Sequence, residues 1–276
     1  GPRLNAAGRL ESALAAYELL TTTDVFTASQ LALQLEQQNR DRQDLTRLTH
    51  ARARQIALDA DPDAPLLFAV DPDFRPGVVG LAAARLTEEF YRPAVVATQY
   101  PDITKGSARS IREFHITEAF DQCRHLLIRH GGHAAAAGFT AATEKVNALA
   151  GALREIAARE LSGVDLRAAL HIDAEVPLAD VNWELQKYLK QFEPCGYGNP
   201  TPLLATRGLK VVRSRTVGAE GRHLKLTLSD GRATADATAF RQGEWQEKMP
   251  ARVDVAYVVE ANEWQGEMRL QLNIRD

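Results

Sequence analysis

The chain has 276 residues, of which 45% are hydrophobic and 25% charged, and its formal net charge is −3. This length suffices for two domains, while the apolar runs are too interrupted for a membrane span and no signal peptide opens the chain, so we expect a cytoplasmic protein. Cys123 and Cys195 are isolated, which argues against a zinc cluster and gives no disulfide framework.

The net charge lacks the overall basic signature of a nucleic-acid binder, so DNA would have to contact local basic patches. These are Arg3 with Arg9, Lys105 with Arg109 and Arg112, and the basic residues of 207–225.

The first ten residues, GPRLNAAGRL, place Arg3, Asn5 and Arg9 among small residues that would let a ligand approach closely. The same pattern is typical of an ordinary helix entry, so alone it does not decide between the two interpretations. A short helix is expected over 10–20.

A second, much longer helix is expected over 28–60, capped by Asp24 or Thr27 and ended by Asp61-Pro62. A helix of this length is either a coiled-coil arm or a spacer between domains. Its apolar stripe is too interrupted for a sustained heptad seam, which favours the spacer and leaves dimerisation as the alternative.

Strands and helices alternate from 65 to 161, which predicts an α/β domain with one sheet. We expect strands at 66–70, 93–98 and 105–111, helices at 78–90, 116–129 and 143–161, and a glycine turn after the second helix. Short connections favour the intervening helix packing back on the sheet, which would bring that turn next to 105–111.

Two segments of this domain carry groups suited to oxyanions. In KGSARSI, strand alternation would point Ser107 and Arg109 to the same side, with Ser110 adjacent. In RHGGHAAAAGFT, Gly131 and Gly132 expose consecutive backbone N–H groups, and His133 can donate to an anion that they hold. Glycine pairs usually mark turns and a single His is usually a core or surface residue, so the glycine motif gains weight only beside the other two.

The last part of the chain changes to strand alternation. A joining segment, 164–200, contains one strand and one helix, whose core face would comprise Trp183, Leu185, Tyr188, Leu189 and Phe192. Five strand candidates follow, with a hairpin signal at 229–232, which predicts a small Greek-key barrel of the OB type. Such barrels bind single strands through basic grooves and aromatic platforms. The candidates are Arg213, Arg215, His223, Lys225 and Trp264. Trp264 could instead close the barrel end, and we expect Trp245 in the core.

The order and spacing of these motifs resemble the RecJ family of single-strand-specific exonucleases, within the DHH/DHHA1 phosphoesterases. FEPCGYGNPTPLLA also resembles the family's Glu-Pro-Phe-Gly-x-Gly-Asn-Pro junction, with Cys195 in place of Phe. The resemblance implies four parts. These are the end of a DHH domain and a connector helix at 1–62, a DHHA1 domain at 63–163, the joining segment at 164–200 and an OB-fold domain at 201–276.

The resemblance implies 5′-to-3′ hydrolysis of single-stranded DNA in recombination and repair, using two Mn²⁺ or Mg²⁺ ions. The family's metal ligands include an Asp-His-His triplet, yet no Asp-His dipeptide occurs here and the methionines are Met249 and Met268. We therefore expect a carboxy-terminal piece that lacks the metal domain, holds no metal and is inactive alone. Arg3, Ser107 and Arg109 would hold the terminal 5′ phosphate, with Asn5, Arg9 and Ser110 nearby. Gly131, Gly132 and His133 would hold phosphates near the scissile bond, where His133 could assist.

Two other functions stay open at this stage. A related phosphodiesterase of short oligonucleotides or cyclic dinucleotides would typically lack a barrel, so the last third of the chain argues against it. A binding module for single-stranded DNA without chemistry is the alternative from another class. A helicase or a single-strand-binding protein is a candidate partner, and nothing demands more than a monomer.

Overall fold

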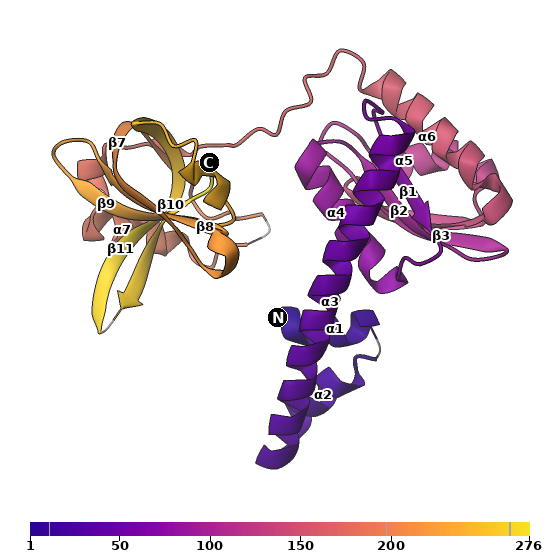
Figure 1. Ribbon diagram of the computed structural model, residues 1–276, viewed down its shortest axis with the longest axis horizontal. Helices are drawn as coiled ribbons and strands as arrows, with labels where there is room; N and C mark the ends of the chain where they lie inside the picture. Colours follow the sequence, from indigo (N-terminus) through magenta and orange to yellow (C-terminus); the bar gives the residue numbers. More distant parts are fainter. Residues whose placement is uncertain (11, 197, 265) are drawn as a thin grey trace. The chain divides into compact units, whose positions relative to one another are not determined.

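The computed structural model describes residues 1–10, 12–196, 198–264 and 266–276, with the side chains of Leu10 and Trp264 left out. The chain divides into two compact units, Gly1–Ala168 and Ala169–Asp276 (Figure 1). Within the described ranges, no helix combines the length and apolar character that crossing a membrane requires.

The first unit opens with three helices, α1 (Pro2–Leu10), α2 (Leu14–Thr21) and α3 (Val25–Ala60). The helix expected over 10–20 is α2, which begins at Leu14, and α1 precedes it as a separate helix over GPRLNAAGRL. α1 begins at a proline, whose fixed φ suits the opening turn. Asp24 caps α3, because its carboxylate accepts the Thr27 N–H at 2.8 Å. One end of α3 packs on α1 and α2, and the other reaches the sheet (Figure 1).

The sheet of the first unit has the strand order β1-β2-β3-β5-β4. β1 (Leu67–Asp71) and β2 (Ala94–Gln99) run parallel. β3 (Ile103–Arg109), β5 (Ala136–Ala142) and β4 (Arg129–His133) follow in antiparallel pairing. α3 and α4 (Pro76–Phe90) cover the β1–β2 part of one face with a small-residue core. α5 (Ile116–Gln122) and α6 (Val146–Glu160) cover the other face over Phe68, Phe120 and Phe139.

The glycine motif differs from its predicted form. The helix expected to reach residue 129 ends at Gln122, followed by a 3₁₀ turn over Arg124–Leu126. Gly131 and Gly132 lie in β4 and not in a turn, and the hairpin turn falls on Ala134 and Ala135. A Cβ on Gly132 would lie 2.3 Å from the Ala136 carbonyl oxygen. Glycine is thus required there by the close approach of two strands.

The second unit contains the five expected strands. They are β7 (Leu204–Val217), β8 (His223–Ser229), β9 (Thr234–Ala239), β10 (Arg252–Trp264) and β11 (Glu267–Ile274). Pairing runs β7-β8-β9-β11-β10 and returns from β10 to β7, so the hydrogen-bonded strands form a ring. The alternation of β8 puts Leu224, Leu226 and Leu228 inside this ring. A short strand, β6 (Ala174–Glu175), adds to β7, and α7 (Trp183–Leu189) packs beside the barrel.

Two packing expectations for the second unit are wrong in part. Leu185 and Leu189 contact the barrel core, but Trp183, Tyr188 and Phe192 are about half exposed. α7 is only 7 residues long, so it buries one narrow stripe and leaves the remaining aromatic residues in solvent. Trp245 is 48% exposed and lies in a 3₁₀ turn over Gly243–Gln246, so it is not a core residue.

Candidate phosphate-binding site

Ser107 and Arg109 point to the same side of β3, as the alternation predicts. Both lie under Gly80 of α4, where an added Cβ would come within 3.0 Å of Arg109 Nη2 and 3.4 Å of Ser107 Oγ. The missing side chain at Gly80 therefore gives the guanidinium and the hydroxyl their space.

The register places the glycine motif on the same face of the sheet. Arg109 pairs with Ala136, which pairs with His133. Ser107 pairs in the same way with Gly138, which pairs with Gly131. Directly paired residues share a face, and two strand spacings separate His133 from Arg109 by about 10 Å. Residues of the KGSARSI motif and of the glycine motif thus lie in adjacent rows on one face of the sheet.

This part of the face is uncovered. Gly131 and Gly138 are exposed, and a Cβ on Gly131 would meet nothing within 4 Å. The next row consists of Lys105, Thr140 and Arg129, so two further basic side chains border the glycine floor. The sequence prediction missed Arg129. The face to which its side chain points follows only once Gly131 is known to lie in the same strand, because residues two apart in a strand share a face.

The hairpin that carries His133 is attached to the segment after β3. The Ala135 carbonyl accepts from Ser110 N at 2.9 Å, and the Ala134 carbonyl accepts from Ile116 N at 3.1 Å. Ser110 Oγ itself donates to the Phe114 carbonyl at 2.6 Å, which gives this side chain a structural role. His133 Nδ1 accepts from Ala135 N at 3.4 Å. A neutral imidazole bonded in this way carries its proton on Nε2, where it can donate.

Arg109 is half-buried and lacks an acidic partner. Its Nη1 donates to the Ala108 carbonyl at 2.8 Å, and it forms no ion pair with any described residue. Burial lowers the pKa of Arg109 and the nearby charge of Arg9 lowers it further. A cation held in this way is well prepared to bind an anion.

The three residues predicted from the first segment take different places. Asn5 and Arg9 line a pocket of about 270 Å³ with Arg42 of α3 and Leu81 of α4. Arg3 instead forms an ion pair with Glu36 of α3, outside this pocket. The charge of Arg9 lowers the pKa of Arg109, whereas Arg3 pairs with Glu36. Arg42 was missed because, in the sequence, it only interrupts an apolar stripe.

No group of three or more His, Cys, Asp or Glu residues able to hold a metal ion occurs in the described part of the chain. The described residues therefore do not fit a metal centre.

Basic candidates of the second unit lie on the outer face of the β7–β8 ribbon. Arg215 pairs with Lys225 and Arg213 with Thr227, while the intervening Ser214 pairs with the core residue Leu226. His223 is more constrained, because its Nδ1 accepts from Arg241 N at 2.9 Å and its ring contacts Phe240 edge-on. Phe240 is 52% exposed beside these basic residues, and the sequence prediction did not include it among the aromatic candidates. The side chain of Trp264, predicted as a platform, lies outside the described residues.

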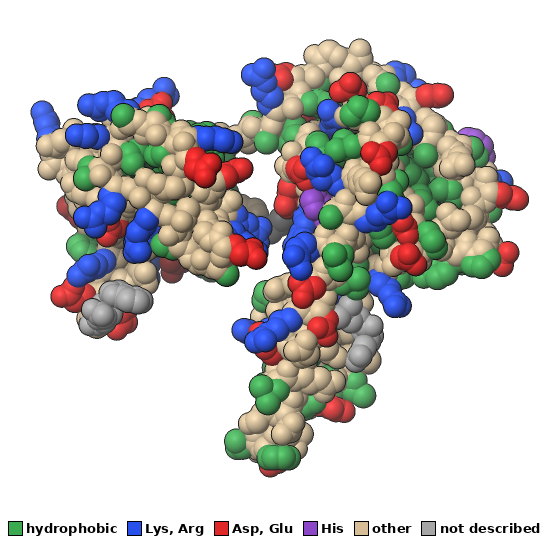
Figure 2. All heavy atoms as spheres, viewed as in Figure 1, with side chains coloured by type: hydrophobic (Ala, Val, Ile, Leu, Met, Phe, Trp, Pro, Cys, Tyr) green, Lys and Arg blue, Asp and Glu red, His purple; other side chains and the backbone are tan. Residues whose placement is uncertain are grey.

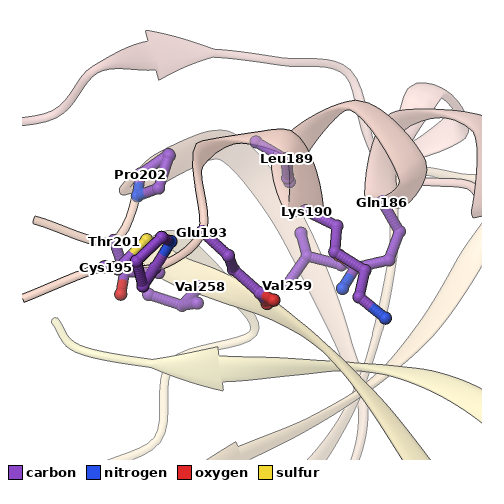
Figure 3. A pocket seen from close by; sticks show the side chains of 10 residues that line it. Gln186, Leu189, Lys190, Glu193, Cys195, Thr201, Pro202, Val258 and Val259 are labelled. Atoms are coloured by element: carbon purple, nitrogen blue, oxygen red, sulfur yellow. The ribbon is translucent and has the colours of Figure 1, made fainter. Parts of the chain in front are cut away.

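Internal hydrogen bonds hold the loop of the Glu-Pro-Cys-Gly junction. Asn199 Nδ2 donates to the carbonyls of Phe192 and Pro194 at 2.9 and 3.0 Å, and Gly196 bridges to Asn199. Beside it lies a pocket of about 610 Å³ between α7 and β10, with Cys195 at its wall (Figure 3). We assign the junction motif to loop structure and not to phosphate binding.

Basic and acidic side chains are mixed on the face that Figure 2 shows. Figure 2 shows basic and acidic side chains interspersed on both units, in agreement with the net charge of −3. Basic character is therefore local, at the two surfaces described above.

Comparison with known proteins gives two domain matches. A DHHA1 domain model matches residues 63–159, and a RecJ OB domain model matches residues 172–276. Among curated proteins, the single-stranded-DNA-specific exonuclease RecJ of Bacillus subtilis is 34% identical over 279 residues, covering 100% of this chain and 36% of that protein. RecJ of Thermus thermophilus is also 34% identical, over 275 residues, covering 100% of this chain and 39% of the relative.

A solved structure supports the same relationship. The crystal structure of RecJ from Thermus thermophilus in complex with Mn²⁺ aligns with a TM-score of 0.81 at 32% identity, over 100% of this chain and 40% of that chain. A second RecJ structure from the same organism, in complex with Mg²⁺, aligns with the same score. The chain spans between 36% and 50% of the length of the curated relatives that it matches.

Proposed function

Because this chain belongs to the RecJ family, with a DHHA1 domain followed by a RecJ OB domain, we propose that it is part of a single-stranded-DNA exonuclease and supplies DNA binding. The observation that carries this proposal is one sheet face on which Ser107 and Arg109, at the edge of α4, and His133 lie around an uncovered glycine floor. Side-chain donors beside a guanidinium that has no ion pair among the described residues suit phosphate oxygens.

In this proposal the complete enzyme degrades single-stranded DNA in the 5′-to-3′ direction during recombination and repair. The relatives' structures with Mn²⁺ and Mg²⁺ support a divalent metal in the complete enzyme. The described residues of this chain hold phosphates: Arg109 and Ser107 at the strand's 5′ end, and the glycine floor with His133 Nε2–H nearer the scissile bond. The barrel contacts the strand elsewhere, through Arg213, Arg215 and Lys225. A helicase or single-strand-binding partner, the monomeric state and the cytoplasmic location stay predictions.

The proposal is tested by binding and cleavage assays on the purified chain. We expect it to bind 5′-labelled single-stranded DNA and to release no mononucleotides in the presence of Mn²⁺ or Mg²⁺, because phosphate donors are present and a metal cluster is not found among the described residues. Metal-dependent release of mononucleotides would assign catalysis to this chain. Binding no tighter than that of an unrelated protein of equal charge would show that the sheet face is not a DNA site.

A second prediction concerns the barrel surface. Phosphate contacts release counterions, so the logarithm of the binding constant should fall linearly with the logarithm of salt concentration, by about 0.7 per phosphate contact on a single strand. Replacing Arg215 and Lys225 together by Gln should reduce this slope by about 1.4. Arg207→Gln is the matched control, because Arg207 on the same strand is already paired with Glu175 at 2.9 Å. An unchanged slope in the double variant would remove the ribbon from the binding surface.

A further inference from the structure

The strand that carries the glycine motif, β4, has few contacts with the core of the first unit. It lies at the end of the strand order and pairs with β5 alone. Alternation points Arg129, Gly131 and His133 to the face of the glycine floor. His130 and Gly132 point to the opposite face, and only His130 has a side chain there. None of the five residues of β4, all of which the structure describes, is fully buried.

His130 lies against α5 on that opposite face. It pairs with the core residue Phe139, and its side chain is only 9% exposed. The ring packs beside Phe120 of α5, with 6.1 Å between the two ring centroids. His130 Nε2 lies 2.9 Å from Oδ1 of Asp121, which is also on α5. An ionised carboxylate only accepts, so Nε2 carries the proton and donates in a charge-assisted hydrogen bond.

α5 is a firm support for β4. Its residues Ile116, Ala119 and Phe120 are fully buried in the core. A second polar contact comes from Thr117, whose Oγ1 donates to the His133 carbonyl at 2.9 Å. One side-chain hydrogen bond therefore joins α5 to β4 near each end of the strand.

These hydrogen bonds matter because the rest of β4 is weakly held. A segment with few buried apolar contacts opens locally while the rest of the fold stays intact. Opening would move Gly131 and His133 away from Ser107 and Arg109, which lie on the inner strand β3. The contacts between β4 and α5 therefore decide how often the glycine floor is assembled.

We propose that His130 and Asp121 are a positioning pair, which holds β4 on α5 and thereby sets the affinity of the glycine floor for single-stranded DNA. Both residues lie on the side of the sheet that α5 covers, so they act through the backbone of β4 and not by touching the strand that binds. The DNA part of this inference rests on the proposed function, but the attachment of β4 to α5 does not.

Two pairs of variants test the hydrogen bond. His130→Leu keeps an apolar side chain and removes the donor, while Asp121→Ala removes the acceptor. His130→Gln and Asp121→Asn each keep the bond, because the amide nitrogen of Gln reaches the position of His Nε2 and Asn still accepts through its oxygen. Arg124→Gln is the matched control, because Arg124 also contacts Asp121, at 3.6 Å on the exposed surface.

The first measurement is hydrogen exchange at the backbone amides of β4, which needs no DNA. His130→Leu and Asp121→Ala should each speed exchange over 129–133 by about tenfold, the low end for a hydrogen bond to a charged group. The double variant should exchange no faster than either single variant, because both remove the same bond. Arg124→Gln should exchange as the wild type does. If His130→Leu does not fold, Asp121→Ala decides, since Asp121 is half exposed.

The second measurement is the fluorescence anisotropy of a labelled single-stranded oligonucleotide with a 5′ hydroxyl end. It is made in the Arg215→Gln, Lys225→Gln background, so that the barrel contributes less. His130→Leu and Asp121→Ala should lower the affinity by up to the same factor, because only closed β4 assembles the floor, and His130→Gln should restore it. A purely structural pair would lower the melting temperature and leave the affinity of the folded variants unchanged, and that result would overturn the positioning role.

The two measurements separate this inference from the proposed function. Unchanged exchange and unchanged affinity in both single variants would refute the positioning pair while DNA binding stands. The same losses in Arg124→Gln would contradict it equally, since the effect would then belong to the surface ion pair of Asp121. A wild-type chain that binds no DNA, although both single variants speed exchange at β4, would refute the DNA function while the attachment of β4 to α5 stands.

Discussion

Gly77→Ala is expected to lower the free energy of unfolding of the first unit by about 1–3 kcal/mol, the usual cost of overpacking. A Cβ at this position would lie 1.8 Å from the carbonyl oxygen of Arg9, and 2.7 Å from its carbonyl carbon. Both atoms belong to the backbone of α1, so no rotation of a side chain can relieve the contact. The variant must therefore move α1 away from the first turn of α4.

The matched control is Gly151→Ala in α6, where an added Cβ meets nothing within 4 Å. There the substitution should stabilise the unit by about 0.4–1 kcal/mol, since alanine restricts the unfolded chain and favours a helix. Calorimetric unfolding of the two variants gives both values. Equal stability of Gly77→Ala and wild type would mean that α1 is not held against α4 in solution.

The same substitution connects packing to the phosphate-binding face of the first unit. Arg9 keeps its charge in Gly77→Ala, but its backbone must shift relative to Arg109. Binding of a 5′-phosphorylated strand should therefore weaken although no basic residue has been removed. Gly77 and Gly80 are three residues apart on α4; Gly77 lets the backbone of Arg9 approach, and Gly80 leaves space for the guanidinium of Arg109.

Features set by local pattern could be predicted from the sequence. The alternation of β3 correctly gave Ser107 and Arg109 a common side. The same pattern predicted a strand where β8 lies, and its Leu224, Leu226 and Leu228 are core residues in the structure. The OB domain followed from a series of such strands and is confirmed by the domain match. These predictions succeed because side chains alternate between the two faces of a strand whichever strands pair with it.

Features set by contacts between distant segments could not be predicted. Gly131-Gly132 has the local chemistry of a turn, and only pairing with β5 makes it a strand. Arg42 resembles the solvated arginines of any helix, and only the packing of α1 and α4 makes it line a pocket together with Arg9. Arg3 was expected at the phosphate because of its motif, whereas Glu36, 33 residues away, pairs with it. Tertiary contacts thus decide whether the glycine pair forms a turn or a strand, and which arginines remain without an acidic partner.

Arg109→Lys should keep the fold and narrow the preference for a 5′-phosphorylated strand, because an ammonium is a point charge in place of two parallel donors. Losing a charge-assisted contact of this kind costs about 1.5–3 kcal/mol, or about one to two decades in affinity for the phosphorylated end. Arg124→Lys is the control, because Arg124 is 80% exposed and contacts Asp121 at 3.6 Å. The measurement is the affinity ratio between the two strand ends, with thermal unfolding to verify the fold. A structural role would require an acidic partner, and the nearest candidate in sequence, Glu113, instead accepts from the Tyr91 hydroxyl at 3.0 Å. A folded Arg109→Lys variant that discriminates the two ends as well as the wild type would place the 5′ phosphate elsewhere than on β3.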